Sequence, residues 1–416
     1  MTKFAYAGLW IFIFSVPWER IIVLPGLSIV TRATGGLALA LTALAVVVTG
    51  RFRRWRVFHV AALLFVVWTG IGVWVLQAWE IPAKFYTFAQ LFLVVWMIWE
   101  LAATAARQMG LLTAYVLGAY VAAIDTILLY LRQAGALRRF AAGGADPNSL
   151  AMTLALGLPM AWYLGMTYRR PLLRWMCRGY VVVGLVAIGL TGSRGGMLAS
   201  VVALSIVPLT LGKLSPGRRA AAICLLMVSG AVAAAYVPET LVQRFATTGS
   251  EVQEGKLGGR FQIWAGGVKA FAQKPLMGYG TGNFKPAVRP WGGVQVAHNS
   301  YLSVLVEEGL VGFTFFATML VSALLAVLRL RGMERRFALI LWATLGIAIL
   351  PLTWEDQKEV WFTMSALVGL AAAPAAGLNR GAGQARARPF APVARVPLRP
   401  VRQPASAGRL DPDATA

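Results

Sequence analysis

Apolar residues along this chain occur in long continuous blocks, not at the period of an amphipathic helix. Clear examples are the blocks at 37–48, 57–75, 111–130 and 180–190. A helix needs about 20 mostly apolar residues to cross the hydrocarbon core of a bilayer. Because these blocks lack polar alternation, they also exclude a membrane β-barrel. The pattern therefore predicts an all-α polytopic membrane protein.

The predicted spans number about twelve, which is an even count. They lie near 5–24, 34–50, 57–78, 84–105, 110–131, 149–167, 173–191, 195–212, 219–237, 300–328, 337–353 and 359–377. Residues 1–377 would thus form one membrane domain. Residues 378–416, rich in Ala, Pro, Gly and Arg, are expected to form a disordered basic tail.

One connection is much longer than the others, at 238–299. A connection of this length is usually functional or disordered. We expect two short helices in it, at 238–245 and 260–271. The second would present one apolar face that packs on the bundle or rests in the membrane interface, consisting of Phe261, Trp264, Val268 and Phe271.

Composition and charge agree with a membrane protein and set its orientation. The chain is 58% hydrophobic and 13% charged, with a net charge of +23, whereas a soluble domain carries roughly a quarter charged residues. Arginines gather in alternate connections and acids in the others, which is the positive-inside pattern with both termini in the cytoplasm. The basic excess is therefore assigned to topology and to contact with anionic membrane lipids, and nucleic-acid binding is not favoured.

A second set of arginines falls on the predicted outer side, where the orientation rule disfavours them. A guanidinium cluster there suits an anionic ligand, and phosphate matches its bidentate geometry best. For any single arginine, pairing with an outer acid or a lipid headgroup is the alternative. The set comprises Arg20, Arg32, Arg132, Arg138, Arg139, Arg194, Arg244, Arg260 and Arg289.

Three residues of the predicted outer side are the best candidates for chemistry. Arg194 lies in a glycine-rich turn between two spans with almost no loop. A charge at this depth in the membrane is costly, so Arg194 either has a function or extends its side chain to the membrane surface. Arg260 begins the predicted loop helix, where the helix dipole favours an anion. His298, at the end of the long loop, is the natural proton acceptor near neutral pH, although alone it is as readily a structural hydrogen-bonding residue.

Several carboxyl groups are also candidates. Glu307 and Glu308, at the start of a predicted span, would orient the histidine or a sugar hydroxyl, or else make polar contacts within the bundle. The outer group Glu355, Asp356 and Glu359 is a candidate site for a divalent metal, but only the spacing of these residues supports it. Since no zinc-protease, P-loop or nucleophile-elbow motif is present, we expect neither a metal nor a cofactor.

In this middle part the chain resembles the O-antigen ligases and their relatives, the O-antigen polymerases and protein O-oligosaccharyltransferases. The resemblance covers about 190–315. The motifs that carry it are Ser193-Arg194-Gly195-Gly196, Gly259-Arg260-x-x-x-Trp264, Pro275-Leu-Met-Gly278-Tyr-Gly280, His298-Asn299-Ser300-Tyr301 and Glu308-Gly309-Leu310-Val311-Gly312.

The resemblance implies a metal-independent, inverting glycosyltransferase of the GT-C type in the bacterial inner membrane, with a periplasmic active site. Its donor would be O-antigen linked to undecaprenyl diphosphate, and its acceptor the lipid A–core oligosaccharide. His298 would deprotonate the acceptor hydroxyl, while Arg194 and Arg260 would bind the diphosphate. Further substrate-binding residues would be Arg138, Arg139, Arg289, Asn299 and Tyr301.

Three other functions stay open at this point. A polymerase is favoured by an arginine followed eleven positions later by glycine, at Arg132 with Gly143 and at Arg244 with Gly255. A protein O-oligosaccharyltransferase belongs to the same superfamily. A transporter of lipid-linked glycan would need charges or broken helices within the membrane, and the predicted spans hold few charges apart from Asp125.

Overall fold

The computed structural model describes residues 1–22, 30–75, 82–133, 139–212, 214–236, 259–293 and 295–373. These residues are helical with connecting turns, and no strand occurs among them, so the predicted all-α class is confirmed. The elements are α1 (Thr2–Ser15), η1 (Val16–Trp18), α2 (Val30–Thr49), α3 (Val57–Val75), α4 (Pro82–Leu101), α5 (Ala105–Gln133), η2 (Ala142–Gly144), α6 (Pro147–Thr167), α7 (Pro171–Thr191), α8 (Arg194–Leu204), α9 (Ile206–Leu211), α10 (Pro216–Tyr236), α13 (Arg260–Gln273), α14 (Phe284–Val288), η4 (Arg289–Trp291), α15 (Ser300–Leu328), α16 (Gly332–Ala348) and α17 (Lys358–Ala372).

Helices occur at all twelve predicted span positions, but they differ in length. Within the described ranges, seven stretches are long and apolar enough to cross a membrane, namely α2, Ala83–Leu101 of α4, α5, α6, α7, Arg194–Leu211 of α8 and α9, and α15. The count of twelve spans therefore stays a prediction. The expected helix at 238–245 and the expected tail at 378–416 lie outside the described residues.

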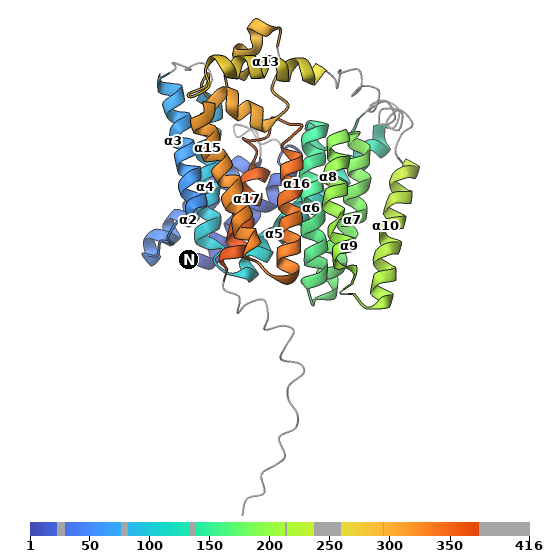
Figure 1. Ribbon diagram of the computed structural model, residues 1–416. Coiled ribbons are helices and arrows are strands. Elements are labelled where there is room, and N and C mark those ends of the chain that lie inside the picture. The colour runs from blue at the N-terminus through green and yellow to red at the C-terminus, as the bar shows by residue number, and fades with distance from the viewer. Residues whose placement is uncertain are drawn as a thin grey trace, which may run out of the picture. The chain divides into compact units, whose positions relative to one another are not determined.

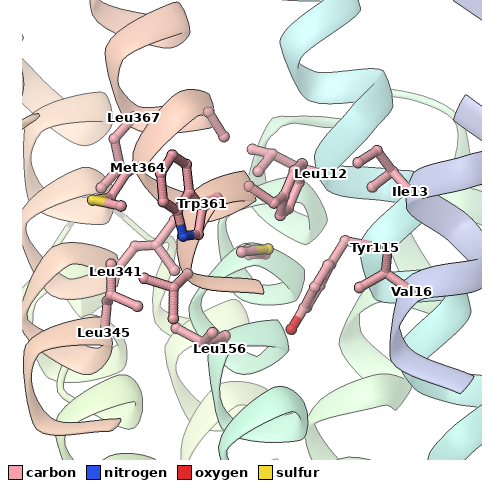
Figure 2. Packing of buried hydrophobic residues seen from close by; sticks show 14 of the residues in the cluster. Ile13, Val16, Leu112, Tyr115, Leu156, Leu341, Leu345, Trp361, Met364 and Leu367 are labelled. Carbon is pink, nitrogen blue, oxygen red and sulfur yellow. The ribbon is translucent and has the colours of Figure 1, made fainter. Parts of the chain in front are cut away.

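Two helices, α6 and α17, form the interior of the bundle. Residues 150–165 of α6 and 359–370 of α17 are buried without interruption, and a helix surrounded by protein must be apolar on every face. Figure 2 shows Trp361 of α17 among residues of the neighbouring helices α16 and α5. The rings of Tyr115 and Phe362 stack there, with centroids 5.2 Å apart.

The sequence predicted α15 as one continuous span, but the helix is broken at Gly309, where φ is 65° and ψ is −168°. The glycine-rich segment 275–280 packs into the break. A Cβ atom on Gly309 would lie 2.2 Å from the carbonyl oxygen of Leu276, so only glycine allows this approach. Four backbone hydrogen bonds join the two segments: Leu310 N to Pro275 O (2.8 Å), Val311 N to Leu276 O (3.3 Å), Tyr279 N to Val306 O (2.9 Å) and Gly280 N to Glu307 O (2.8 Å).

Helix α13 lies across one end of the bundle, and the N-terminus of the chain lies at the other end (Figure 1). The predicted helix at 260–271 is confirmed, but its buried face differs from the prediction. Trp264 and Phe271 pack against a small apolar cluster, whereas Phe261 and Val268 are exposed. The residues that α13 buries are Ile263, Gly266, Gly267 and Ala270, because small side chains let the helix approach α15 closely.

We predict that Gly309→Ala destabilises the protein by about 1–3 kcal/mol, because alanine is strained at this φ and its Cβ atom meets the carbonyl of Leu276. The control is Gly346→Ala in α16, where an added Cβ atom meets nothing within 4 Å. Thermal unfolding in detergent measures both variants. Equal melting temperatures for the two would contradict the role given to the break.

Candidate active site

His298 lies in the short segment that precedes α15, at the end of the bundle covered by α13. Its φ of 45° is the one positive value at a non-glycine residue in the described part of the chain. Its backbone N–H donates to Thr353 Oγ1 at 2.9 Å, and the carbonyl of the preceding Ala297 accepts from Trp264 Nε1 at 3.0 Å. Strained backbone of this kind persists where its surroundings hold it, and it clusters at functional sites.

The segment between α16 and α17 anchors the start of α15. Ser300 Oγ donates to the carbonyl of Leu352 at 2.8 Å and accepts from Trp354 N at 2.8 Å. Asn299 caps α15 by accepting from Leu302 N at 3.0 Å, and Tyr301 packs against the main apolar core. Both Asn299 and Tyr301 thus have structural roles, and their contact with substrate stays a prediction.

The charged neighbours of His298 come from two other helices. Burial lowers the pKa of His298 from its ordinary value of 6.5, nearby Arg260 lowers it further, and nearby Asp146 raises it. The imidazole is therefore neutral near pH 7 and able to accept a proton. The sequence did not identify Asp146 as a neighbour of His298, because its position directly before Pro147 indicates only the start of a helix. Asp146 also has that role, since its side chain accepts from Ser149 N at 2.9 Å and caps α6.

Arg194 and Arg260 each occupy the first position of a helix. Arg194 begins α8, and the preceding Ser193 caps that helix by accepting from Gly196 N at 3.1 Å. The turn before Arg194 spans only two residues after α7, as predicted. A Cβ atom on Gly195 would lie 3.0 Å from Pro351 Cγ, so this turn packs against the same segment that anchors His298.

The other predicted arginines have different placements. Arg139 donates from Nε to the carbonyl of Thr191 at 2.7 Å and from Nη2 to Asn148 Oδ1 at 2.8 Å, so it joins the start of α6 to the end of α7 beside Arg194. Arg289 is exposed in η4, and it is not among the charges that shift the pKa of His298. Arg138 lies outside the described residues.

A buried ion network, which sequence reasoning did not foresee, holds this end of the bundle together. Lys84 Nζ of α4 lies 2.7 Å from Glu307 Oε2 and 2.7 Å from Glu355 Oε1. Glu307 Oε2 also accepts from Gly282 N at 2.9 Å, and Glu355 Oε1 accepts from Ser303 Oγ at 2.6 Å. The only sequence signal was a single lysine at the start of a predicted span.

The network borders a cavity of about 430 Å³ that reaches the histidine segment. Lys84, Glu307, Ala297, Thr353 and Asp356 line this cavity. Glu308 does not line this cavity, and its Oε1 accepts from Thr281 Oγ1 at 2.8 Å. Of the two interpretations of Glu307 and Glu308, the structure places both in polar contacts within the bundle.

The carboxyl groups that were considered for a metal bind separate partners. Glu355 pairs with Lys84, and Glu359 Oε1 accepts from Thr153 Oγ1 at 2.9 Å. Across the described ranges, no group of three or more His, Cys, Asp and Glu side chains has the arrangement of a metal site. The weak metal interpretation of Glu355, Asp356 and Glu359 is thus not supported by their contacts.

The part of the chain that holds these motifs matches a known family. Residues 179–317 match the family model described as O-antigen ligase. This segment is similar to the O-antigen ligase family. It contains Arg194, Arg260 and His298, as well as the segment 275–280 docked on α15. The match to this family, which is associated with glycosyl transfer, together with the apolar helices indicates a membrane protein. No curated protein matches the chain.

We predict that Lys84→Met destabilises the protein by about 3–5 kcal/mol, because it leaves buried carboxylates without their counter-charge. The control is Lys358→Met, which removes the more exposed pair of Lys358 with Glu19 and should cost about 0–1 kcal/mol. Thermal unfolding in detergent compares them. A larger loss for Lys358→Met would contradict the importance given to the buried network.

We predict that His298 titrates below 6.5, and that two variants move its pKa in opposite directions. Asp146→Asn removes the charge that raises the pKa but keeps a good helix cap, so the pKa falls further. Arg260→Gln removes a charge that lowers the pKa, so the pKa rises. Nitrogen NMR of the protein in detergent measures this, and because the chain has only two histidines, His59→Gln assigns the signals. Shifts in the same direction would refute this arrangement of charges.

Proposed function

We propose that this protein is an O-antigen ligase that transfers O-antigen glycan from undecaprenyl diphosphate to lipid A–core oligosaccharide. We further propose that it acts at the periplasmic face of the bacterial inner membrane, with both termini in the cytoplasm. The proposal makes the bundle a GT-C-type glycosyltransferase. It assigns the end of the bundle covered by α13 to the periplasm, in agreement with the alternation of basic and acidic connections along the sequence.

The observation that carries the proposal is the environment of His298 within the matched segment. The imidazole favours its neutral form, it lies near Arg260 and Asp146, and its backbone anchor packs against the turn that holds Arg194. A base beside fixed positive charge is what transfer from a diphosphate to a hydroxyl requires.

In the proposed reaction, His298 accepts the proton of the acceptor hydroxyl as that oxygen attacks the anomeric carbon of the glycan. The bond between this carbon and the diphosphate oxygen breaks, and the diphosphate leaves with the electron pair. Arg194 and Arg260 stabilise the charge that develops on it. Attack from the opposite face inverts the anomeric carbon. No step in this sequence requires a metal or a cofactor.

An O-antigen polymerase is the nearest alternative, because the family match does not separate the two activities. The glycine spacing that favours a polymerase has a structural explanation at Gly143. Its φ is 56°, and a Cβ atom there would lie 2.5 Å from the backbone of Arg20. Arg244 and Gly255 lie outside the described residues. A protein O-oligosaccharyltransferase differs from the proposal only in its acceptor.

A transporter of lipid-linked glycan is the alternative of another class. The break in α15 and the burial of Lys84 are features that the sequence did not indicate, and transporters use broken helices and buried charges. Here, however, the charges pair with one another near the start of α15, and Asp125 accepts from the backbone of Gly143 at 3.2 Å. These contacts favour a fixed scaffold.

We predict that His298→Ala lowers glycan transfer by about 10²–10⁴-fold, and that Arg194→Ala and Arg260→Ala each lower it by about 10²–10³-fold. The control is Arg335→Ala, an exposed residue near the start of α16, which should leave transfer within roughly twofold. The purified protein in vesicles receives lipid-linked glycan, with and without lipid A–core.

The products decide between the alternatives. Transfer to the core supports a ligase, chain growth on the carrier lipid identifies a polymerase, and movement of intact lipid-linked glycan across the vesicle identifies a transporter. If the His298→Ala variant transfers glycan as fast as the wild type, the assigned role of the base is wrong.

A further inference from the structure

The glycine-rich segment 275–280 carries two large apolar side chains at its tip. Leu276 is 63% exposed and Met277 is 39% exposed. Leu310 of α15, which is 44% exposed, adjoins them because its N–H donates to the carbonyl of Pro275. The backbone of the tip is thus fixed by its hydrogen bonds to α15. A contiguous apolar patch on a fixed turn indicates a surface for a partner, whereas single exposed apolar residues need no explanation.

After the break at Gly309, one face of α15 is exposed and mostly apolar. Its exposed residues include Leu310, Val321, Leu325 and Leu328, and their spacing returns each of them to the same side of the helix. From Leu310 to Leu328 the helix rises about 27 Å, which is close to the roughly 30 Å of hydrocarbon core in a bilayer. This face therefore fits a lipid-facing span that begins at Leu310.

Helix α3 packs beside α15 at one edge of the bundle (Figure 1), and it has an exposed apolar face of its own. That face includes Val60, Leu64, Val67 and Ile71. Trp68 Nε1 of α3 donates to the carbonyl of Glu308 at 2.9 Å, and a Cβ atom on Gly72 would lie 3.7 Å from Gly280 Cα. The Ile71 end of the exposed face is thus level with the break in α15 and with the segment 275–280.

The tip therefore lies where two lipid-facing helices reach the boundary of the hydrocarbon core. The residues that flank it are typical of this level. Lys274 precedes the tip and Tyr279 follows it, with the lysine ammonium 4.7 Å from the centre of the tyrosine ring. Lysine and tyrosine side chains combine an apolar body, which lies in lipid, with a polar end that reaches the headgroups.

From this placement we propose that Leu276 and Met277 insert into the bilayer, where membrane phospholipid covers them. Phospholipid is favoured over a protein partner because the patch continues the exposed apolar faces of α3 and α15. The inference rests on the membrane-spanning role of these helices and not on glycan transfer. Helix α13 begins with Arg260 and ends at Gln273, just before the tip, so the inserted tip anchors this part of the candidate active site to the membrane surface.

The test measures the depth of the tip with a fluorophore attached to single cysteines. The full chain, freed of its two native cysteines by Cys177→Ala and Cys224→Ala, is placed in bilayer discs of phosphatidylethanolamine and phosphatidylglycerol. Leu276→Cys labels the tip. Val321→Cys, on the exposed face of α15, is the reference in lipid. Ala265→Cys is the reference in water, because it is exposed on the side of α13 opposite the residues that this helix buries.

Two quenchers report the surroundings of the label, namely phospholipid with brominated acyl chains and iodide in the water. We expect the brominated lipid to quench the label at position 276 as it does at position 321. Iodide should quench it about tenfold less than at position 265, because moving one side chain such as Met277 out of water favours the inserted state by about that factor or more.

A charge at the tip should reverse this result. Met277→Asp, added to the labelled Leu276→Cys protein, should raise quenching by iodide toward the value at position 265, since an aspartate is costly in hydrocarbon. The matched control is Val268→Asp, which changes another exposed apolar residue, one on α13 that the inference leaves in water. It should not alter the quenching at position 276, and both variants should melt near the temperature of the labelled parent.

Two results would overturn the inference. Equal quenching by iodide at positions 276 and 265 would place the tip in water. Protection of position 276 from both quenchers would show that protein covers the tip, either a second copy of this chain or another partner. The comparison of positions 276, 321 and 265 needs no charge variant, so it decides the matter even if Met277→Asp fails to fold.

Discussion

Lys84 lies with its ammonium 2.7 Å from a carboxylate oxygen of Glu307 and 2.7 Å from one of Glu355. These three residues come from α4, from α15 and from the segment before α17, and Gly282 of the long loop binds the same carboxylate of Glu307. Charges buried in this way are stable only together, since removing one leaves the others without compensation. The position of the loop, the start of α15 and the approach to α17 therefore depend on one another.

The three main residues of the candidate site all stand at a helix start or just before one. Arg194 and Arg260 are the first residues of α8 and α13, and His298 lies two residues before α15. The positive end of the helix dipole at an N-terminus favours negative charge nearby. The fold thus brings positively polarised backbone and two arginines to the same end of the bundle, while Asp146 moderates the field at the histidine.

The sequence predicted the helical class, the helix at Arg260, the short turn at Arg194 and the family, because each leaves a local signal. Long apolar blocks, apolar residues at helical spacing and glycine-rich motifs are visible without knowledge of tertiary contacts. The break in α15, the pairing of Lys84 and the proximity of Asp146 to His298 were not predicted. Each of these depends on residues far apart in the chain, and the buried face of α13 depends on how closely its glycines let it approach α15.

The anchoring of His298 also has a consequence for the biosynthesis of the protein. Its backbone is held by Thr353, 55 positions later in the chain, and Ser300 is held by Leu352 and Trp354. A ribosome-bound chain that has inserted α15 but not yet α16 therefore holds the histidine without its anchor. The backbone conformation of His298 is therefore fixed only after the segment that follows α16 has been synthesised.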